Sequence, residues 1–433
     1  MLMNAIHNSQ SGNLRDKTLD HDSTQYAALV GIDWGDKEHA FHLKSDDGTF
    51  ESGTLRHSSE TLFQWLSKLE ERFGSRPVAF AIEAQSPPLL AAIRQFSWAV
   101  VFQIHPITSK RLRTAFTPSG AKDDLPDAKV LLDLLISHRD KLRPLPEPAS
   151  PKTRILDGIC RERRELVDQR TKWCLQTRAA LKAYFPQAFE LFSDELFRPV
   201  VSKFLARWPD LISLKAEKSS IIKRFYTSNG YRNVALIDQR LEIIKTSIAI
   251  EIDPSRISEY TRKVKHILER IELANRQIKE LDLQMSTVFK EHENWQFFRE
   301  LPGAGPSLAP RLLCAINMAP ENNAQGMQKY FGTAPVKEKS GSRVWTHRRW
   351  NAPRFFHQTW GEWAGLSVQH SRWAKEFYEQ AKARGKGRYT ALRALAFKWM
   401  RVIARCLETK TDYNEELYIQ SLKKRQSPLA QHL

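Results

Sequence analysis

The strongest constraint on the fold of this 433-residue chain is a stripe of apolar residues with alternating spacings of three and four. Apolar residues that recur in this way over more than four heptads predict one long helix with a single buried face. A shorter stripe precedes it, and Asp253-Pro254 separates the two helices because proline interrupts helical hydrogen bonding. The long stripe favours a coiled-coil contact between protomers, with packing inside one bundle as the alternative. The stripes comprise Ile257, Tyr260, Val264, Ile267, Ile271, Ala274, Ile278, Leu281, Met285 and Val288, and before them Val234, Ile237, Leu241, Ile244 and Ile248.

The first third of the chain predicts an α/β domain. Short apolar runs bounded by turn residues are typical of buried strands. Asp46-Asp47-Gly48, between two shorter candidate strands, is a hairpin signal. Three antiparallel strands followed by strands that alternate with helices are typical of a ribonuclease-H-like, or RuvC-like, domain. The expected strands are Tyr26–Asp33, His39–Lys44, Thr49–Leu55, Pro77–Glu83 and Trp98–His105, with a helix over Ser59–Phe73.

Four prolines in residues 141–151 (KLRPLPEPASP) predict a stiff, extended linker between two folded regions. No segment approaches the ~18 consecutive apolar residues of a membrane span, and no hydrophobic signal core opens the sequence. The four cysteines are too widely scattered for a zinc motif. The expected organisation is a flexible leader over 1–25, a RuvC-like domain over 26–140, the linker 141–151, a helical and coiled-coil region over 152–294, a mostly helical C-terminal domain over 295–410 and a tail over 411–433.

An excess of positive charge narrows the class of partner. The chain has 67 Lys and Arg residues against 49 Asp and Glu, a formal net charge of +18. Such an excess favours a polyanion, because each phosphate that is neutralised releases a bound counterion. Basic residues interleaved with aromatic ones concentrate near the C-terminus, and we expect nucleic-acid contact there, with a solvated charged face as the alternative. These residues are Lys382, Arg384, Lys386, Arg388, Arg393 and Arg401, with Tyr389, Phe397 and Trp399.

Four acidic residues occupy positions that suit a metal site. Asp33 and Glu83 end two predicted buried strands, and Asp124 and Asp127 precede an apolar helical run. Each alone is consistent with a turn or a helix cap. Together they offer hard oxygen donors that suit Mg²⁺ or Mn²⁺, and two such ions can clamp the attacking and leaving oxygens of phosphoryl transfer. We therefore expect a metal-dependent phosphoryl-transfer site.

A glycine-rich turn, Leu301–Gly305 (LPGAG), precedes a predicted apolar helix over Leu308–Ile316. The pattern resembles a helix-hairpin-helix element, in which the amides of Gly303 and Gly305 approach a DNA phosphate. A tight turn that binds no ligand is the alternative.

These motifs resemble those of the DEDD transposases of the insertion-sequence 110 family, including its 1111-type branch. In the N-terminal region the resemblance rests on VGIDWGDKEHAFHL around Asp33, AIEA around Glu83, HPITSKRLR at 105–113 and KDDLPDAKVL at 122–131. In the last of these, Asp123 replaces the Thr or Ser usual in the family, and Asp124 and Asp127 stay in register. In the C-terminal region it rests on LPGAGPSLAPRLL at 301–313, KYFGTAPVKEKSGSR at 329–343 and RGKGRYTALRALAFKWMRVI at 384–403.

The resemblance implies a serine nucleophile. The family's Gly-x-x-Pro followed by Ser-Gly falls on Gly332, Pro335, Ser340 and Gly341, so Ser340 is the implied nucleophile and Ser342, two positions further on, is the alternative. A serine hydroxyl needs a base or a metal to activate it, and no Ser/His/Asp spacing is visible nearby. The basic residues that follow, among them Arg343 and Arg348, suit the binding of a scissile phosphate. The implied site is composite: the carboxylate-bound metal meets Ser340, and cleavage leaves a covalent phosphoserine.

The resemblance also implies partners. A structured guide RNA, called a bridge RNA, pairs with target and donor DNA, as in other guided systems. The implied enzyme is a homo-oligomer, a dimer or tetramer, associated with the nucleoid in a prokaryotic cytoplasm, and it cuts and rejoins the DNA of an insertion sequence. One alternative is a structure-specific nuclease such as a Holliday-junction resolvase, which needs the carboxylates but no serine. The other is a nucleic-acid-binding scaffold with an inactive site.

Overall fold

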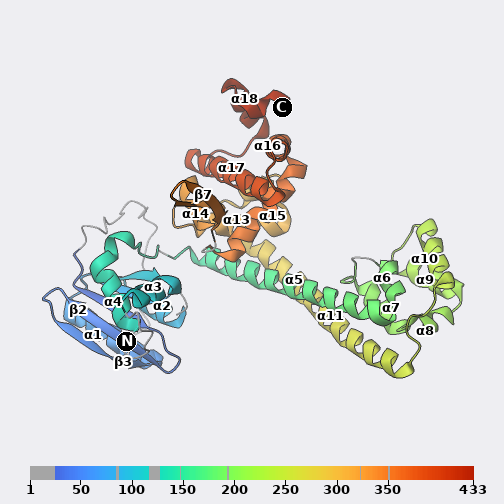
Figure 1. Ribbon diagram of the computed structural model, residues 1–433, viewed down its shortest axis with the longest axis horizontal. Coiled ribbons are helices and arrows are strands. Elements are labelled where there is room, and N and C mark those ends of the chain that lie inside the picture. Colours follow the sequence, from blue (N-terminus) through green and yellow to red (C-terminus); the bar gives the residue numbers. More distant parts are fainter. Residues whose placement is uncertain are drawn as a thin grey trace. The chain divides into compact units, whose positions relative to one another are not determined.

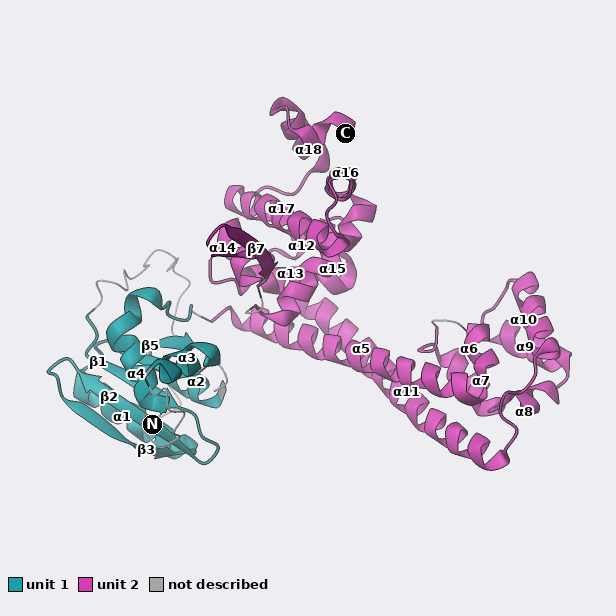
Figure 2. Ribbon diagram, viewed as in Figure 1, with its two compact units in different colours: residues 1–147 teal, residues 148–433 magenta. Residues whose placement is uncertain are grey.

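The computed structural model describes residues 25–83, 87–116, 127–146, 148–192, 195–321, 323–349 and 352–433. The chain divides into two compact units, residues 1–147 and residues 148–433 (Figure 2). The first unit is a mixed α/β structure, and the second is mostly helical (Figure 1). Residues 1–24 of the expected leader lie outside the described residues.

A five-stranded sheet forms the centre of the first unit, in the order β3-β2-β1-β4-β5. The first three strands are antiparallel, and β4 and β5 run parallel to β1. This arrangement confirms the predicted α/β pattern, and the Asp46-Asp47-Gly48 hairpin forms with Gly48 at a φ of 88°. The strands are β1 (Ala28–Asp33), β2 (Glu38–Ser45), β3 (Phe50–Arg56), β4 (Val78–Glu83) and β5 (Ala99–Ile104).

Helices cover both faces of this sheet. Val30 and Phe80 belong to a core shared with α1 (Ser59–Phe73) and α2 (Pro87–Ile93) on one face. Ala79 and Ala81 belong to a second core with α4 (Asp127–His138) on the other face. Helix α3 (Pro106–Phe116) follows β5, and a 3₁₀ turn, η1 (Arg139–Lys141), follows α4.

Two long helices, α5 (Pro151–Tyr184) and α11 (Pro254–Lys290), form the spine of the second unit. They lie side by side and antiparallel (Figure 1), because Arg163 pairs with Asp282 while Arg170 donates to Asn275. The predicted stripe from Ile257 to Val288 is buried in this contact and in the helices at its end. The interpretation of the stripe as a contact between protomers is therefore wrong, since one chain buries it alone.

Five shorter helices pack at the Tyr184 end of the spine around an aromatic core. Phe192, Phe204 and Tyr226 are fully buried there, and the Phe192 and Phe204 rings stand 5.0 Å apart. Helix α11 contributes Val264 and Ile267 to the same core. The helices are α6 (Pro186–Phe192), α7 (Pro199–Arg207), α8 (Leu211–Lys215), α9 (Ser219–Ser228) and α10 (Val234–Thr246).

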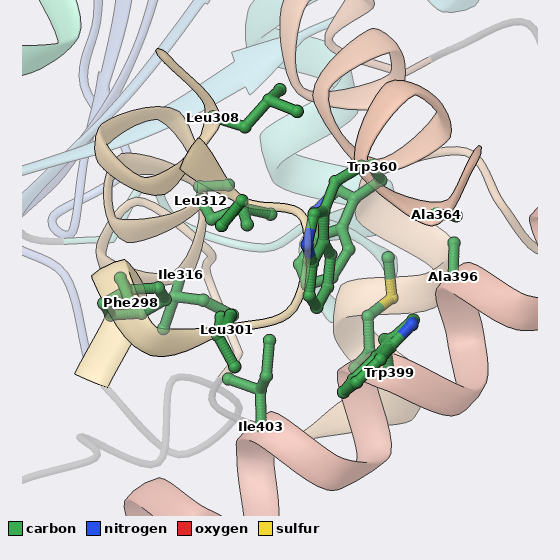
Figure 3. Packing of buried hydrophobic residues seen from close by; sticks show 14 of the residues in the cluster. Phe298, Leu301, Leu308, Leu312, Ile316, Trp360, Ala364, Ala396, Trp399 and Ile403 are labelled. Carbon is green, nitrogen blue, oxygen red and sulfur yellow. The ribbon is translucent and has the colours of Figure 1, made fainter. Parts of the chain in front are cut away.

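The opposite end of the spine carries a helical domain with a tryptophan-rich core. Trp360, Trp363, Trp373 and Trp399 are fully buried, and Figure 3 shows Trp360 and Trp399 among the apolar side chains of this core. The elements are α12 (Trp295–Glu300), α13 (Gly305–Asn317), α14 (Ala324–Tyr330), β6 (Pro335–Ser340), β7 (Arg343–Arg348), α15 (Arg354–His370), α16 (Arg372–Ala383), α17 (Arg388–Thr409), α18 (Glu415–Lys424) and η2 (Pro428–His432).

This domain is mostly helical, as predicted, and it also contains a two-stranded hairpin, β6 and β7, that was not predicted. The C-terminal segment differs from expectation. The segment set apart as a tail packs into the same core through Ile419, Leu422 and Leu429. No helix in the described part of the chain is both long enough and apolar enough to cross a membrane.

Candidate active site

Two of the four predicted carboxylates end neighbouring strands on the same face of the sheet. Asp33 is the last residue of β1 and Glu83 the last of β4, and the register pairs Ile32 with Ile82 just before them. Side chains alternate between faces along a strand, so Asp33 shares a face with Gly31, and Glu83 shares one with Ala81. Both of these small residues face α4. The two carboxylates therefore project at the α4 side of the sheet edge.

Gly31 lets α4 approach the sheet. A Cβ atom at this position would lie 2.1 Å from the carbonyl oxygen of Ala128 and 2.4 Å from the amide nitrogen of Leu132. Only glycine fits beneath a helix backbone that lies this close. Asp127 is the first residue of α4, so the close packing brings its carboxylate to the edge that carries Asp33 and Glu83.

The electrostatics of Asp33 show that these three carboxylates are near one another. The pKa of Asp33 is raised from 3.8 to about 6, mainly by burial and then by the charges of Asp127 and Glu83. Arg113 and the backbone amide of Trp34 oppose this shift. Repulsion between neighbouring carboxylates and partial burial both disfavour the ionised form, so one of the three acids holds its proton more tightly.

Helix α3 supplies two partners that sequence reasoning did not identify. Ser109 is buried, and its Oγ lies 2.6 Å from Oε1 of Glu83, to which it donates a hydrogen bond. Arg113 forms an ion pair with Asp127. Both residues lie in HPITSKRLR, the segment after β5 quoted above as a motif without assigned roles. Their position, four residues apart on a helix that starts at the sheet edge, was the available signal.

The described residues contain no group of three His, Cys, Asp or Glu side chains arranged to hold a metal ion. Asp124 and Asp123 lie outside the described residues. The chemistry of the site nevertheless suits a divalent cation, since it offers hard oxygen donors whose mutual repulsion a cation relieves. In this structure Arg113 provides that positive charge at Asp127.

Ser340 lies at the tip of the β6–β7 hairpin. It ends β6 and pairs in register with Arg343, and Gly341 and Ser342 form the two-residue turn between them. Gly341 has a φ of 59°, as such a turn requires. Ser340 is exposed, and within the described residues no side chain hydrogen-bonds to its Oγ. The hairpin therefore presents the hydroxyl to solvent without an adjacent base.

The remaining candidate residues are spread over the second unit. Gly303 has a φ of 72°, and a Cβ there would lie 3.1 Å from the Leu366 carbonyl oxygen, so the turn packs against α15. Gly305 begins α13 with a φ of 56° and has open space around it. The positive φ of both glycines suits a tight turn, and contact of their amides with a DNA phosphate stays a prediction. Lys386 is exposed just before α17, and Arg388 is the first residue of that helix. Arg348 ends β7.

Comparisons with known proteins agree with both halves of the chain. Residues 30–186 match a family model of DEDD transposases of the IS110 type, and residues 296–379 match one described as the IS116/IS110/IS902 transposase family. A relative from Streptomyces coelicolor, named as the mini-circle putative transposase for IS117, is 25% identical over 90% of this chain and 95% of its own length. An uncharacterized protein of the insertion element IS116 from Streptomyces clavuligerus is 24% identical over 74% of this chain and 79% of its own.

Proposed function

The chain belongs to the IS110 family of transposases, enzymes that cut and rejoin DNA, and we propose that it moves an insertion sequence through attack of Ser340 on a DNA phosphate with the help of divalent metal. The observation that carries the proposal is the convergence of Asp33, Glu83 and Asp127 at one edge of the sheet. Such a cluster is costly to bury unless it serves a cation or a proton.

Asp33, Glu83 and Asp127, with Asp124, are the residues that would hold the metal. A bound divalent ion supplies a Lewis acid that stabilises negative charge on the phosphoryl group. The chain itself holds the carboxylate oxygens of Asp33, Glu83 and Asp127 in place, because these residues belong to the packed elements β1, β4 and α4 and not to loops. Ser109 orients one oxygen of Glu83, and among the described residues no hydrogen bond occupies the second, which suits a ligand.

Ser340 would be the nucleophile. Its Oγ loses its proton and forms a bond to the phosphorus atom, one P–O bond of the DNA backbone breaks, and the departing deoxyribose oxygen takes up a proton. The product is a phosphoserine ester that keeps the energy of the broken bond, so a second DNA hydroxyl can reverse the step without ATP. Exposure of Ser340 at a hairpin tip supports this role because a DNA strand can reach it. Arg343, opposite Ser340 in the register, suits the neutralisation of the phosphate.

Two further parts of the proposal concern partners. A guide RNA would choose the target and donor sequences, and the net charge of +18 supports a large nucleic-acid partner. A dimer or tetramer would hold the several strand ends that exchange requires. The buried stripe of α11 lends no support to an oligomer, which now rests on the reaction alone.

Strand exchange with serine variants tests the proposal against a hydrolytic nuclease. The measured quantity is joined and cleaved product from an insertion-sequence end, with Mg²⁺ present. Ser340→Ala is expected to abolish both products, and the neighbouring control Ser342→Ala is expected to retain them. A nuclease that uses water would keep cutting in Ser340→Ala, and this result would reject the serine mechanism. Loss of activity in Ser342→Ala alone would transfer the role to Ser342.

A further inference from the structure

A groove in the second unit runs between α5, α15 and α17. Its volume is about 1150 Å³, which exceeds the ~300–1,000 Å³ typical of pockets for small ligands. Arg354 and Gln369 both line it, so the groove follows α15 over about 22 Å of helix. An extended polymer suits these dimensions better than a compact ligand.

One end of the groove lies at the base of the hairpin that carries Ser340. Thr333, two residues before β6, and Arg354, six residues after β7, both line it. Ser340 is at the far end of a six-residue strand, roughly 20 Å from that base. A strand lying in the groove can therefore continue toward the serine.

The other end lies at the start of α17. Helices α15 and α17 are antiparallel, because Thr333 contacts Met400 beside the first turn of α15 while Leu392 lies against Gly365. Arg388 therefore stands near Gln369, at the end of α15 away from the hairpin. Both helices begin with an arginine, and the residue before each, Pro353 or Gly387, provides no side-chain cap. Uncapped amides and the helix dipole favour phosphate.

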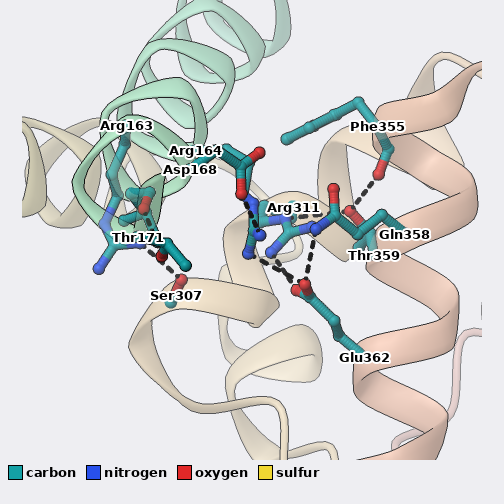
Figure 4. Close-up of polar contacts among 11 residues, drawn as sticks. Arg163, Arg164, Asp168, Thr171, Ser307, Arg311, Phe355, Gln358, Thr359 and Glu362 are labelled. Carbon is teal, nitrogen blue, oxygen red and sulfur yellow. Dashed lines mark hydrogen bonds and ion pairs between the residues drawn. The ribbon is translucent and has the colours of Figure 1, made fainter. Parts of the chain in front are cut away.

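Three residues that line the groove, Arg164, Asp168 and Glu362, belong to an ion-pair network (Figure 4). The Glu362 carboxylate accepts hydrogen bonds from Arg311 at 2.7 Å, Arg164 at 2.9 Å and Gln358 at 2.9 Å. Its negative charge is thus neutralised by two guanidinium groups and does not repel a polyanion. Asp168 is likewise paired with Arg164.

The rim carries the groups that remain available. Arg354 and Arg388 are exposed, and neither has an acidic partner within the described part of the chain. Tyr389 is 76% exposed beside Arg388. Arginines for phosphates and aromatic rings for bases are the combination that binds single-stranded nucleic acid.

We propose that this groove holds single-stranded DNA next to the phosphate that Ser340 attacks. The inference rests on the proposed function, which identifies DNA as the substrate and the hairpin as the place of cleavage. Arg354 and Arg388 bind phosphates at its two ends, and Tyr389 stacks on a base.

Fluorescence anisotropy with the full chain and a labelled single-stranded DNA oligonucleotide tests the groove. The double variant Arg354→Gln/Arg388→Gln is expected to weaken binding at least about tenfold and to reduce the slope of log K against log salt by roughly 0.7 per arginine. Tyr389→Ala is expected to weaken it about tenfold without a change in slope. Arg405→Gln is the matched control, because Arg405 is exposed on α17 and outside the groove.

Two further arms, a duplex DNA and an RNA of the same sequence, distinguish the occupant. The inference is overturned if wild type and groove variants bind single-stranded DNA with equal affinity. It is also overturned if the groove variants lose more affinity for the duplex or the RNA than for single-stranded DNA. Mapping the protein–DNA adduct distinguishes failure of the groove proposal from failure of the proposed serine mechanism. An adduct on Ser340 with unaltered binding in the groove variants rejects only the groove. Weakened binding without any serine adduct rejects only the serine mechanism.

Discussion

The carbonyl oxygen of Ala128 in α4 lies directly over Gly31 in β1, so close that a Cβ at position 31 would stand 2.1 Å from it. This contact determines how near the first residue of α4, Asp127, comes to Asp33 at the end of β1. The geometry of the carboxylate cluster therefore depends on a residue that has no side chain.

Gly31→Ala is expected to destabilise the first unit by about 3 kcal/mol, because α4 must move away from the sheet. The displacement also separates Asp127 from Asp33, so Mn²⁺ binding weakens. Urea unfolding and calorimetric titration measure the two effects. Gly158→Ala in α5 is the control, since a Cβ there meets nothing within 4 Å and alanine should stabilise the helix by about 0.5–1 kcal/mol. Unchanged stability in Gly31→Ala would show that α4 does not pack as described.

Arg113→Gln removes the cation that pairs with Asp127. The cluster then carries more uncompensated negative charge, and affinity for Mn²⁺ is expected to rise about fivefold, a modest effect because both side chains are partly exposed. Isothermal titration calorimetry measures it directly. Arg111→Gln, an exposed position on the same helix, should leave the affinity unchanged. A weaker affinity in Arg113→Gln would mean that the arginine helps to assemble the site.

The raised pKa of Asp33 predicts how stability depends on pH without metal. In the unfolded chain this group titrates near 3.8, whereas in the fold its pKa is about 6. Between these values the folded state binds more protons, so the contribution of Asp33 is fully present below pH 3.8 and is lost as pH rises through about 6. Asp33→Asn should flatten this part of the stability curve, measured by denaturant unfolding across the window. An unaltered curve in the variant would contradict the assignment.

Glu362→Ala leaves two guanidinium groups, one of them on the buried Arg311, without their shared carboxylate. The expected loss of stability is about 3 kcal/mol, because an unpaired buried charge is costly. Urea unfolding of the full chain gives the value. Glu165→Ala serves as comparison, since this exposed residue bonds only to Gln169 among described residues and should change stability by less than about 0.5 kcal/mol. An equal loss of stability in both variants would show that the ion pairs of Glu362 do not stabilise the fold.

Local sequence signals predicted the first unit closely. The helix over Ser59–Phe73 forms with those bounds, because Ser58 caps its amides and Gly74 adopts the left-handed conformation that ends it. All five strands form within two residues of expectation, since buried strands show as short apolar runs. Asp33 and Glu83 could be assigned to one site because adjacent parallel strands end at the same edge.

Longer-range features were not accessible to this reasoning. The stripe of α11 identifies a buried face but not its partner, and the partner is α5 of the same chain. The hairpin that carries Ser340 has a polar, exposed β6, and the apolar Val344 and Trp345 of β7 are adjacent and do not alternate, so no periodicity marked it. The four-residue spacing of Ser109 and Arg113 indicates one face of α3, but it does not identify their partners, Glu83 in β4 and Asp127 in α4.

Identification of the protein–DNA adduct is the most direct test of the proposed chemistry. The wild-type protein is allowed to react with a suicide DNA substrate in Mg²⁺, and the adduct is digested and located by mass spectrometry. The account predicts a nucleotide attached to Ser340, and no adduct with Asp33→Asn. An adduct on a different residue, or one that forms equally well in Asp33→Asn, would contradict it.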